Sequence, residues 1–399
     1  MLSRRTIIAL IGLLLWTITS SCTKEEETFI PRDRGTILEI LERGSLNREE
    51  IISRMNELDG SALAQYDVDF FALTYRTQYM GKAIDTRGLI IVPRGVDIAN
   101  LLMYTHGTEL PSEILGANDI SPSNYAGEMD KNRDVRNMGL GWASAGYVVF
   151  MPDYIGYGIT IGTDHPYMYM EEMFVSNMDG LLAAKEFILN HTDLTYDNRL
   201  FLAGWSQGGA ASLSTHRFVQ EQFPTEFNIL GSSHLAGPHN FERFHNDKMS
   251  RAGEEVLIMP IFSWAVYSIN KFSELRRPTD QLYNYPVFDQ MSSILTPSSD
   301  PALVFKSHFR TSILNGNDSA YRAVLKRNSN HEGWLPVGKV ILHHGDDDQI
   351  VPYYNSEDAR DGILAAGGEV EFYTYPGGGH TSELGNFIIN TTNEFNLLK

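Results

Sequence analysis

Short apolar segments separated by helical stretches are the feature that most constrains how this chain can fold. Apolar residues run almost without interruption through these segments, which is typical of strands in a parallel sheet covered on both faces. Residues 170–191 carry a broad apolar stripe over a length that suits a right-handed crossover between parallel strands. The sequence therefore predicts an α/β fold with a mostly parallel central sheet and helices on both faces. The strand candidates are residues 101–107, 147–154, 199–205, 228–235, 339–345 and 369–375.

Two regions before this pattern have a different texture. Residues 68–77 and 87–95 are extended segments separated by polar residues and a glycine, and they predict two neighbouring antiparallel strands. Residues 23–65 are expected to form a helical arm. Asn47 with Glu50 makes a capping-box pattern there, and apolar residues recur at helical spacing after it.

A long interval interrupts the strand–helix rhythm between residues 235 and 339. It is far longer than the few residues that usually connect two elements. We expect a mostly helical cap at 241–335, because the sheet pattern returns at Lys339; a separate domain is the alternative. The predicted domains are a signal peptide at 1–21, an anchor tether and helical arm at 22–65, a core at 66–240 and 336–399, and the inserted cap at 241–335.

The first residues predict export. Two arginines, an apolar run at 7–18 and three small residues at 19–21 are typical of a signal peptide. Cys22, the single cysteine of the chain, would become the new N-terminus. This arrangement resembles the bacterial lipoprotein signal, although Thr19 stands where that signal usually has leucine. An unmodified cysteine beside an ordinary cleavage site is the alternative, but an exported chain with one cysteine has no disulfide of its own to form.

The acidic residues after Cys22 are similar to tethers that route lipoproteins to the outer surface of some Gram-negative cells. We therefore expect an exported protein that is lipid-anchored in the bacterial cell envelope, at the outer membrane surface. The formal net charge is −18. A chain this acidic repels phosphate backbones, so nucleic acid is not an expected partner.

Ser206 is the candidate nucleophile. It is the centre of Gly204-Trp205-Ser206-Gln207-Gly208, a G-x-S-x-G motif that follows an apolar strand candidate and opens a helix of small residues. The glycines leave out side chains that would collide at a sharp turn, so the hydroxyl is presented at the helix N-terminus. A plain turn serine is the alternative, which the strand and helix on either side disfavour.

A serine hydroxyl needs a base, and the base needs a partner that fixes its tautomer. The expected order along the chain is serine, acid, histidine. Asp348 is the candidate acid, because it follows a strand in the pattern H-G-x-x-D-x-x-V-P, and Asp346 is the second choice. The three aspartates 346–348 lack the ligand spacing of a calcium loop. His380 is the candidate base, since it follows three glycines beyond the last strand.

These residues resemble the α/β-hydrolase superfamily from Tyr66 to Lys399. The stretch GWASAGYVVFMPDYIGYGITIGTDHPY, together with LAGPHNF, is similar to segments of secretory lipases and related bacterial cell-wall-degrading esterases. The resemblance implies carboxylic ester hydrolysis under a lid-like insertion. It also implies an oxyanion site formed by the backbone N–H groups of Gln207 and Thr108.

Three aromatic residues, Tyr154, Tyr157 and Trp205, are the candidates for the substrate pocket, whereas Asp153 is expected to brace a loop. The expected partner is an ester of a lipid, an acylated carbohydrate or an aromatic acid. The chemistry requires no metal and no organic cofactor. Two alternatives stay open: a serine peptidase of the prolyl-oligopeptidase type, for which the chain lacks a large β-rich domain in front, and a non-catalytic binding lipoprotein on the same fold.

Overall fold

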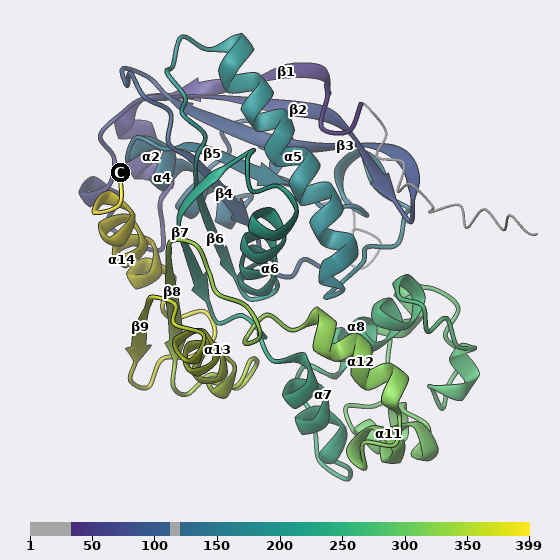
Figure 1. Cartoon of the computed structure of the whole chain (residues 1–399). Coiled ribbons are helices and arrows are strands. Elements are labelled where there is room, and N and C mark those ends of the chain that lie inside the picture. The colour runs from purple at the N-terminus through teal and green to yellow at the C-terminus, as the bar shows by residue number, and fades with distance from the viewer. Residues whose placement is uncertain (1–32, 112–119) are drawn as a thin grey trace, which may run out of the picture. The chain divides into compact units, whose positions relative to one another are not determined.

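A nine-stranded mixed sheet forms the centre of the fold in the computed structural model (Figure 1). The structure describes residues 33–111 and 120–399, and its elements belong to the unit Gly35–Lys399. The strand order is β1-β2-β3-β5-β4-β6-β7-β8-β9. The pairs among β1, β2, β3 and β5 are antiparallel, and all pairs from β5 through β4 to β9 are parallel. The strands are β1 (Ile37–Leu46), β2 (Val68–Tyr79), β3 (Lys82–Pro93), β4 (Leu101–Thr105), β5 (Val148–Pro152), β6 (Arg199–Trp205), β7 (Asn228–Leu235), β8 (Lys339–Gly345) and β9 (Val370–Tyr375).

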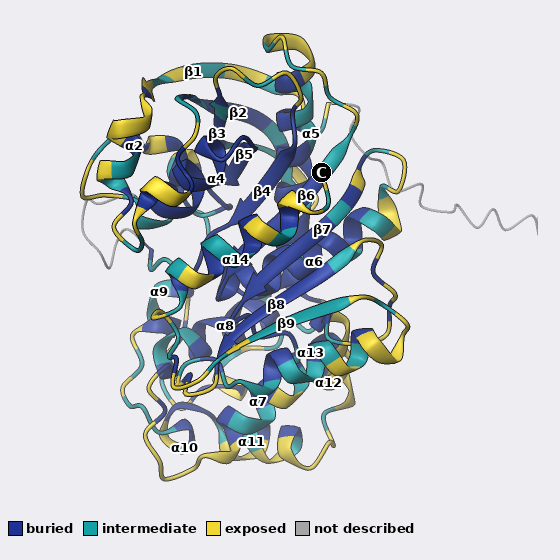
Figure 2. Ribbon diagram, turned by 90° about the vertical axis from the view of Figure 1, so that its left-hand side faces the viewer, coloured by how far each residue is buried: buried dark blue, intermediate teal, exposed yellow. Residues whose placement is uncertain are grey.

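The central strands are apolar on both sides because both faces of the sheet are covered. Along β6, Leu200 and Leu202 join one hydrophobic cluster, while Phe201 and Ala203 between them join the cluster on the other face. Figure 2 shows the central strands buried and β1 and β9, at the two edges, partly exposed. The predicted mostly parallel sheet with helices on both faces is confirmed.

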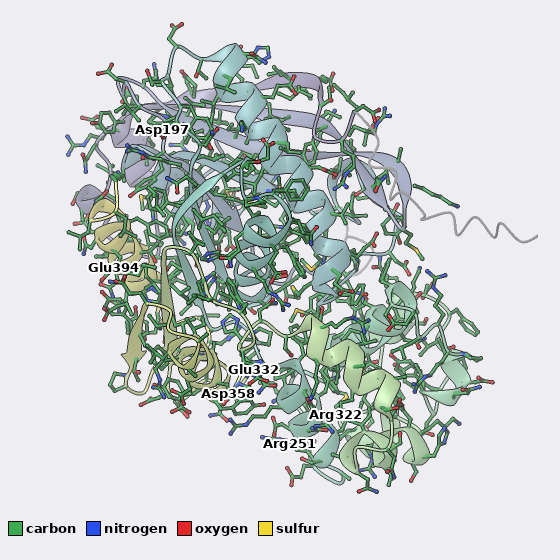
Figure 3. The ribbon with its side chains drawn as sticks, viewed as in Figure 1. Asp197, Arg251, Arg322, Glu332, Asp358 and Glu394 are labelled. Carbon is green, nitrogen blue, oxygen red and sulfur yellow. The ribbon has the colours of Figure 1, made fainter. Side chains whose placement is uncertain are left out.

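Helices cover the two faces of the sheet. The hydrophobic clusters place α5, α6 and α13 on one face and α2, α4 and α14 on the other. Charged side chains such as Asp197 and Glu394 lie at the periphery (Figure 3). These helices are α2 (Arg48–Arg54), α4 (Leu140–Ser144), α5 (Met170–His191), α6 (Gln207–Gln222), α13 (Tyr354–Ala365) and α14 (Leu384–Asn396). Single turns occur at η1 (Gly60–Ala62), η2 (Pro122–Asn124), η4 (Gly158–Thr160) and η5 (Thr279–Gln281), and a π-helical turn at η3 (Val135–Gly139).

The predicted helical arm at 23–65 is wrong over residues 37–46, which form β1, an edge strand paired with β2. Ile37 and Ile40 both pack against the core although their spacing fits a helix better than a strand. The pairing with β2 is irregular at Glu39, and such a bulge brings residues an odd number apart onto one face. The capping box of Asn47 and Glu50 does start a helix, α2, as predicted.

The cap consists of short helices that lie between β7 and β8 in the sequence. In Figure 1 the labelled cap helices α7, α8, α11 and α12 lie together at the lower right, apart from the strands of the sheet. Apolar side chains of the cap, such as Phe244 and Phe262, belong to the same hydrophobic cluster as Met170 and Met173 of α5, so the cap packs continuously onto the core. The cap helices are α7 (Phe241–Ser250), α8 (Met259–Phe272), α9 (Gln290–Ile294), α10 (Pro301–Val304), α11 (Ser307–Leu314) and α12 (Ser319–Asn328).

Two predictions lie outside the described residues: the signal peptide at 1–21 and the lipidation of Cys22. Across residues 33–111 and 120–399, no helix combines the length and the apolar character needed to span a membrane.

Candidate active site

Ser206 stands on a strained turn between β6 and α6. Its backbone has φ +58° and ψ −121°, and residues other than glycine rarely adopt a positive φ. A Cβ atom at Gly204 would lie 2.1 Å from the carbonyl oxygen of Gly208, and one at Gly208 would lie 1.9 Å from that of Thr105. Both motif glycines are therefore required by close backbone approach, and the serine is held at the N-terminus of α6.

The carboxyl ends of the parallel strands bring the three predicted residues together. Ser206 directly follows β6, Asp348 lies three residues after β8, and His380 lies five residues after β9. His380 Nε2 is 2.9 Å from Ser206 Oγ, and His380 Nδ1 is 2.7 Å from Asp348 Oδ2. Because an ionised carboxylate only accepts, Nδ1 carries the proton of neutral His380 and Nε2 is free to accept one from the serine.

The Asp348 carboxylate is buried and fully engaged. Its Oδ1 accepts hydrogen bonds from the backbone N–H groups of Ile350 and Val351, at 2.8 and 3.0 Å. His344 Nε2 is 3.3 Å from Oδ2. Burial acts to raise the pKa of Asp348, but the hydrogen bonds from His344 and His380 outweigh it and hold the pKa well below its usual range. The carboxylate is therefore charged whenever the protein is folded near neutral pH. Asp346, the second choice, is exposed and instead accepts from the N–H of Gly377.

Of the two predicted oxyanion donors, Gln207 directly follows Ser206, and Thr108 lies shortly after Thr105 and His106, whose backbone closely approaches Gly208. Gln207 is the first residue of α6, so its N–H has no acceptor within the helix. Thr108 follows β4 on a loop that three tyrosines hold: its Oγ1 is 2.8 Å from Tyr167 Oη, Tyr154 Oη donates to the carbonyl oxygen of His106, and Tyr157 Oη donates to that of Glu109. The loop is thus fixed by side-chain hydrogen bonds next to the N-terminus of α6.

A small cavity opens beside Ser206. Its wall is formed by core loops and by the cap helices α7 and α8, and most of it is apolar. Sequence reasoning had assigned no role to the residues of this wall except Ser206 and Gln207, since the side chains come from segments distant in sequence. They are Tyr167, Met168, Ser206, Gln207, Pro238, Phe244, Ile258, Ile261, Phe262, Ala265, Ile350 and Val351.

The three predicted pocket residues, Tyr154, Tyr157 and Trp205, do not line this cavity. Tyr154 and Tyr157 are buried and hold the loop that carries Thr108. Trp205 points to the other side of the turn, where its Nε1 donates to the carbonyl oxygen of His380 at 3.0 Å. Consecutive residues near the end of a strand point to opposite faces, so proximity to Ser206 in sequence did not make Trp205 a pocket residue.

Asp153 directly follows β5 and has a different role from the three residues. Its carboxylate accepts from the backbone N–H and the hydroxyl of Ser123, at 2.8 and 2.6 Å. It braces a loop, as expected from the sequence.

A scan against family models and a search of the curated proteins gave no match for this sequence. Solved structures do match. A Legionella pneumophila protein assigned as a hydrolase is 21% identical with a TM-score of 0.76, over 91% of this chain and 98% of that one. The rice cell wall degrading esterase LipA from Xanthomonas oryzae is 20% identical with a TM-score of 0.73, over 92% of this chain and 100% of that one. Candida antarctica lipase A, in its closed state, is 18% identical with a TM-score of 0.60, over 87% of this chain and 78% of that one. At this level of identity the matches establish the architecture, and the chain has the α/β-hydrolase fold.

Proposed function

We propose that this protein is a serine hydrolase that cleaves carboxylic esters. The observation that carries the proposal is the continuous hydrogen-bond chain from Ser206 through His380 to Asp348, with the serine on a strained turn. Nucleophile, base and orienting acid are thereby in the roles that acyl transfer needs. The esterase and the lipase among the structural relatives agree with this chemistry.

The reaction proceeds in two halves. Ser206 Oγ attacks the ester carbonyl carbon while its proton passes to His380 Nε2, and the backbone N–H groups of Gln207 and Thr108 stabilise the negative charge on the carbonyl oxygen. The tetrahedral intermediate breaks its bond to the alcohol oxygen, which takes the proton from His380. Water then attacks the acyl carbon and gives a proton to His380. The second tetrahedral intermediate breaks its bond to Ser206 Oγ, which takes this proton from His380, and the acid leaves.

The cavity indicates which esters fit. The cavity is small and its wall is mostly apolar, which favours a short to medium apolar group over a long chain. The acceptable substrates are then esters of lipids, acylated carbohydrates or aromatic acids whose buried part is compact.

The decisive experiment compares the protein with its Ser206→Ala variant on nitrophenyl esters from acetyl to palmitoyl and on a feruloyl ester. We expect the variant to lose at least about four orders of magnitude in kcat, because removal of a nucleophile usually has that effect or a larger one. Ester hydrolysis within about tenfold of the parent in Ser206→Ala would contradict the proposal. Faster cleavage of proline-containing peptides than of esters would favour the peptidase alternative.

The proposal extends to the location of the enzyme: exported, and anchored in the cell envelope through a lipid on Cys22. Its support is the sequence of the first residues. Metabolic labelling with a radioactive fatty acid should mark the full-length protein and not its Cys22→Ser variant. Protease treatment of intact cells should degrade the labelled protein if it lies on the outer surface.

A further inference from the structure

Gln207 is one of the residues that line the cavity, and the proposed reaction does not use its side chain. Apart from Ser206, the polar side chains of this wall are Gln207 and Tyr167. Tyr167 is already paired, with its hydroxyl 2.8 Å from Thr108 Oγ1. Gln207 Oε1 is buried and has no hydrogen-bond partner among the residues that the structure describes. Within the described part of the chain, Gln207 therefore contributes an acceptor beside the cavity that no other residue satisfies.

His165 fixes which end of the Gln207 amide is free. His165 Nδ1 is 2.7 Å from the carbonyl oxygen of Ile155, which can only accept, so Nδ1 carries the proton. Burial lowers the pKa of His165 to about 3, so the ring is neutral and Nε2 is an acceptor. The Gln207 Nε2 atom, 2.7 Å from His165 Nε2, must be the donor of that bond. The amide oxygen is consequently the end that remains free.

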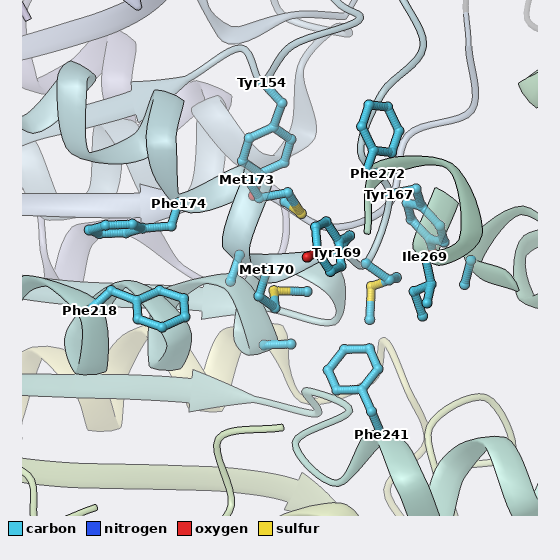
Figure 4. Packing of buried hydrophobic residues seen from close by; sticks show 14 of the residues in the cluster. Tyr154, Tyr167, Tyr169, Met170, Met173, Phe174, Phe218, Phe241, Ile269 and Phe272 are labelled. Carbon is cyan, nitrogen blue, oxygen red and sulfur yellow. The ribbon is translucent and has the colours of Figure 1, made fainter. Parts of the chain in front are cut away.

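Contacts on both sides hold this arrangement. The backbone N–H of His165 donates to Gln290 Oε1 of the cap at 2.9 Å, and Gln207 Nε2 also contacts the sulfur of Met173 at 3.8 Å. Figure 4 shows Met173 and Tyr167 among the packed side chains of the cluster, to which Tyr154 also belongs. The amide cannot turn to satisfy its oxygen without breaking its bond to His165.

We propose that Gln207 Oε1 accepts a hydrogen bond from a hydroxyl group of the substrate, so that the enzyme selects esters whose buried part is hydroxylated over plain alkyl esters. This inference rests on the proposed ester hydrolysis. A buried acceptor that is unpaired in the empty site loses its hydration, and a ligand hydroxyl restores the missing bond, whereas an alkyl group leaves it unmade. A hydroxyl fits better than an ammonium group, because none of the described residues of the cavity wall is a carboxylate that could balance a charge.

The test measures kcat/KM for matched pairs of esters. In one arm, 4-nitrophenyl octanoate is compared with the esters of octanoic acids that carry one hydroxyl at each position from 2 to 6. In the other arm, the hydroxyl is on the alcohol, in the octanoates of propanol and propane-1,2-diol. We expect the native protein to prefer at least one hydroxylated ester by about tenfold, a factor typical of one satisfied hydrogen bond at a buried group.

Gln207→Met and Gln207→Leu remove the acceptor and nearly preserve the volume, and both should bring that ratio to about one. Gln290→Met is the matched control, since Gln290 also bonds to His165 but does not line the cavity, and it should keep the native ratio. A role of Gln207 limited to holding the turn would lower both rates equally and leave the ratio unchanged. An unchanged ratio in the Gln207 variants would overturn the inference. The absence of a preference for hydroxylated esters in both arms of the native protein would also overturn it, and is the outcome expected if a water molecule already satisfies Oε1.

Binding separates this inference from the proposed function. The Ser206→Ala protein should bind the preferred hydroxylated ester more tightly than the plain one in calorimetry, and a second substitution, Gln207→Met, should abolish the difference. If the native protein hydrolyses no ester but this difference in affinity is present, the proposed ester hydrolysis is contradicted and the proposed role of Gln207 Oε1 is supported. If esters are hydrolysed and the difference in affinity is absent, only the proposed role of Gln207 Oε1 is contradicted.

Discussion

The two sides of the candidate site are built from regions that differ in how they depend on the sequence. On one side, the three residues of the candidate triad, Ser206, Asp348 and His380, each follow a strand by at most five residues, and the parallel sheet brings them together at the carboxyl ends of its strands. The cavity wall depends on the packing of α7 and α8 against core loops, which no local pattern specifies. The candidate triad is thus encoded by local patterns in this chain, whereas the cavity wall is encoded by tertiary contacts.

The largest expected effect tests Asp348 as the candidate acid. Asp348→Asn should lower kcat by about four orders of magnitude, because an amide no longer holds His380 in the tautomer that accepts the serine proton. Asp347→Asn is the control: Asp347 is exposed and bonds only its neighbour Gln349 in the side-chain contacts described. It should stay within about twofold of the native enzyme. Equal losses in the two variants would remove Asp348 from the role of acid.

Acid pH should weaken the core and the cap through buried histidines. Burial lowers the pKa of His343 in the core to about 3, that of His216 to about 4, and that of His245 in the cap to about 3. In the unfolded chain these groups titrate near 6.5. Above that pH both states are neutral; as the pH falls below it, the unfolded state binds protons that the native state does not, and the free energy of unfolding decreases.

Each of these histidines should contribute up to about 1.4 kcal/mol per pH unit between pH 6.5 and 4. Urea unfolding at pH 8, 7, 6 and 5 measures the slope, which should be near zero above pH 7.5 and steep below 6.5. His245→Gln should flatten it by one histidine's share. A free energy of unfolding that is constant from pH 7 to 5 would show that these side chains are protonated in the native protein.

A smaller effect is expected where the cap meets the substrate. Ala265→Leu adds bulk to the cavity wall and should reduce kcat/KM for octanoyl esters by about tenfold relative to acetyl esters, since misfit of about one methylene group in an apolar pocket has that size. Val266→Leu, at the next position of α8, is also buried but does not line the cavity. If Val266→Leu shifts the chain-length profile as strongly, the cavity described above is not the one that binds the acyl group.

The smallest effect tests which side of the site Trp205 belongs to. Trp205→Phe keeps a ring but removes the Nε1–H that donates to the carbonyl oxygen of His380. One neutral hydrogen bond accounts for a loss of roughly threefold to tenfold in kcat, with the same factor for every acyl length. A change confined to long or aromatic esters would instead make Trp205 a pocket residue, as the sequence had suggested.

The sequence predicted the features that depend on local order. The strands of the parallel sheet and α5 at Met170–His191 occur where they were expected, because a buried strand and a long amphipathic helix each leave a continuous apolar signature. Ser206, Asp348 and His380 were predicted from short motifs, and from their order along the chain, at positions that follow these strands. Their roles in catalysis stay a prediction until the substitutions above are measured.

Other features were outside the reach of such patterns. The edge strand β1 was misread because the helical signals of the arm, the capping box at Asn47 and the apolar spacing after it, belong to α2, and the irregular strand before them has no regular alternation of apolar and polar residues. The pocket residues were misassigned because the face on which Tyr154 or Trp205 points depends on the turn that each one joins. Tyr154 itself adopts φ +63°, and the residue types around it do not predict this conformation.

The two ends of the cap lie close together where the insertion joins the core. The backbone N–H of Asn330 donates to the carbonyl oxygen of His239 at 3.1 Å, and the N–H of Phe241 donates to Ser329 Oγ at 3.0 Å, so the first and last residues of the insertion are neighbours. A segment with adjoining ends can lengthen, shorten or be exchanged while the strands on either side keep their register. In evolution, and equally in the laboratory, this architecture allows one catalytic framework to acquire a new substrate range by replacement of a single contiguous stretch of gene.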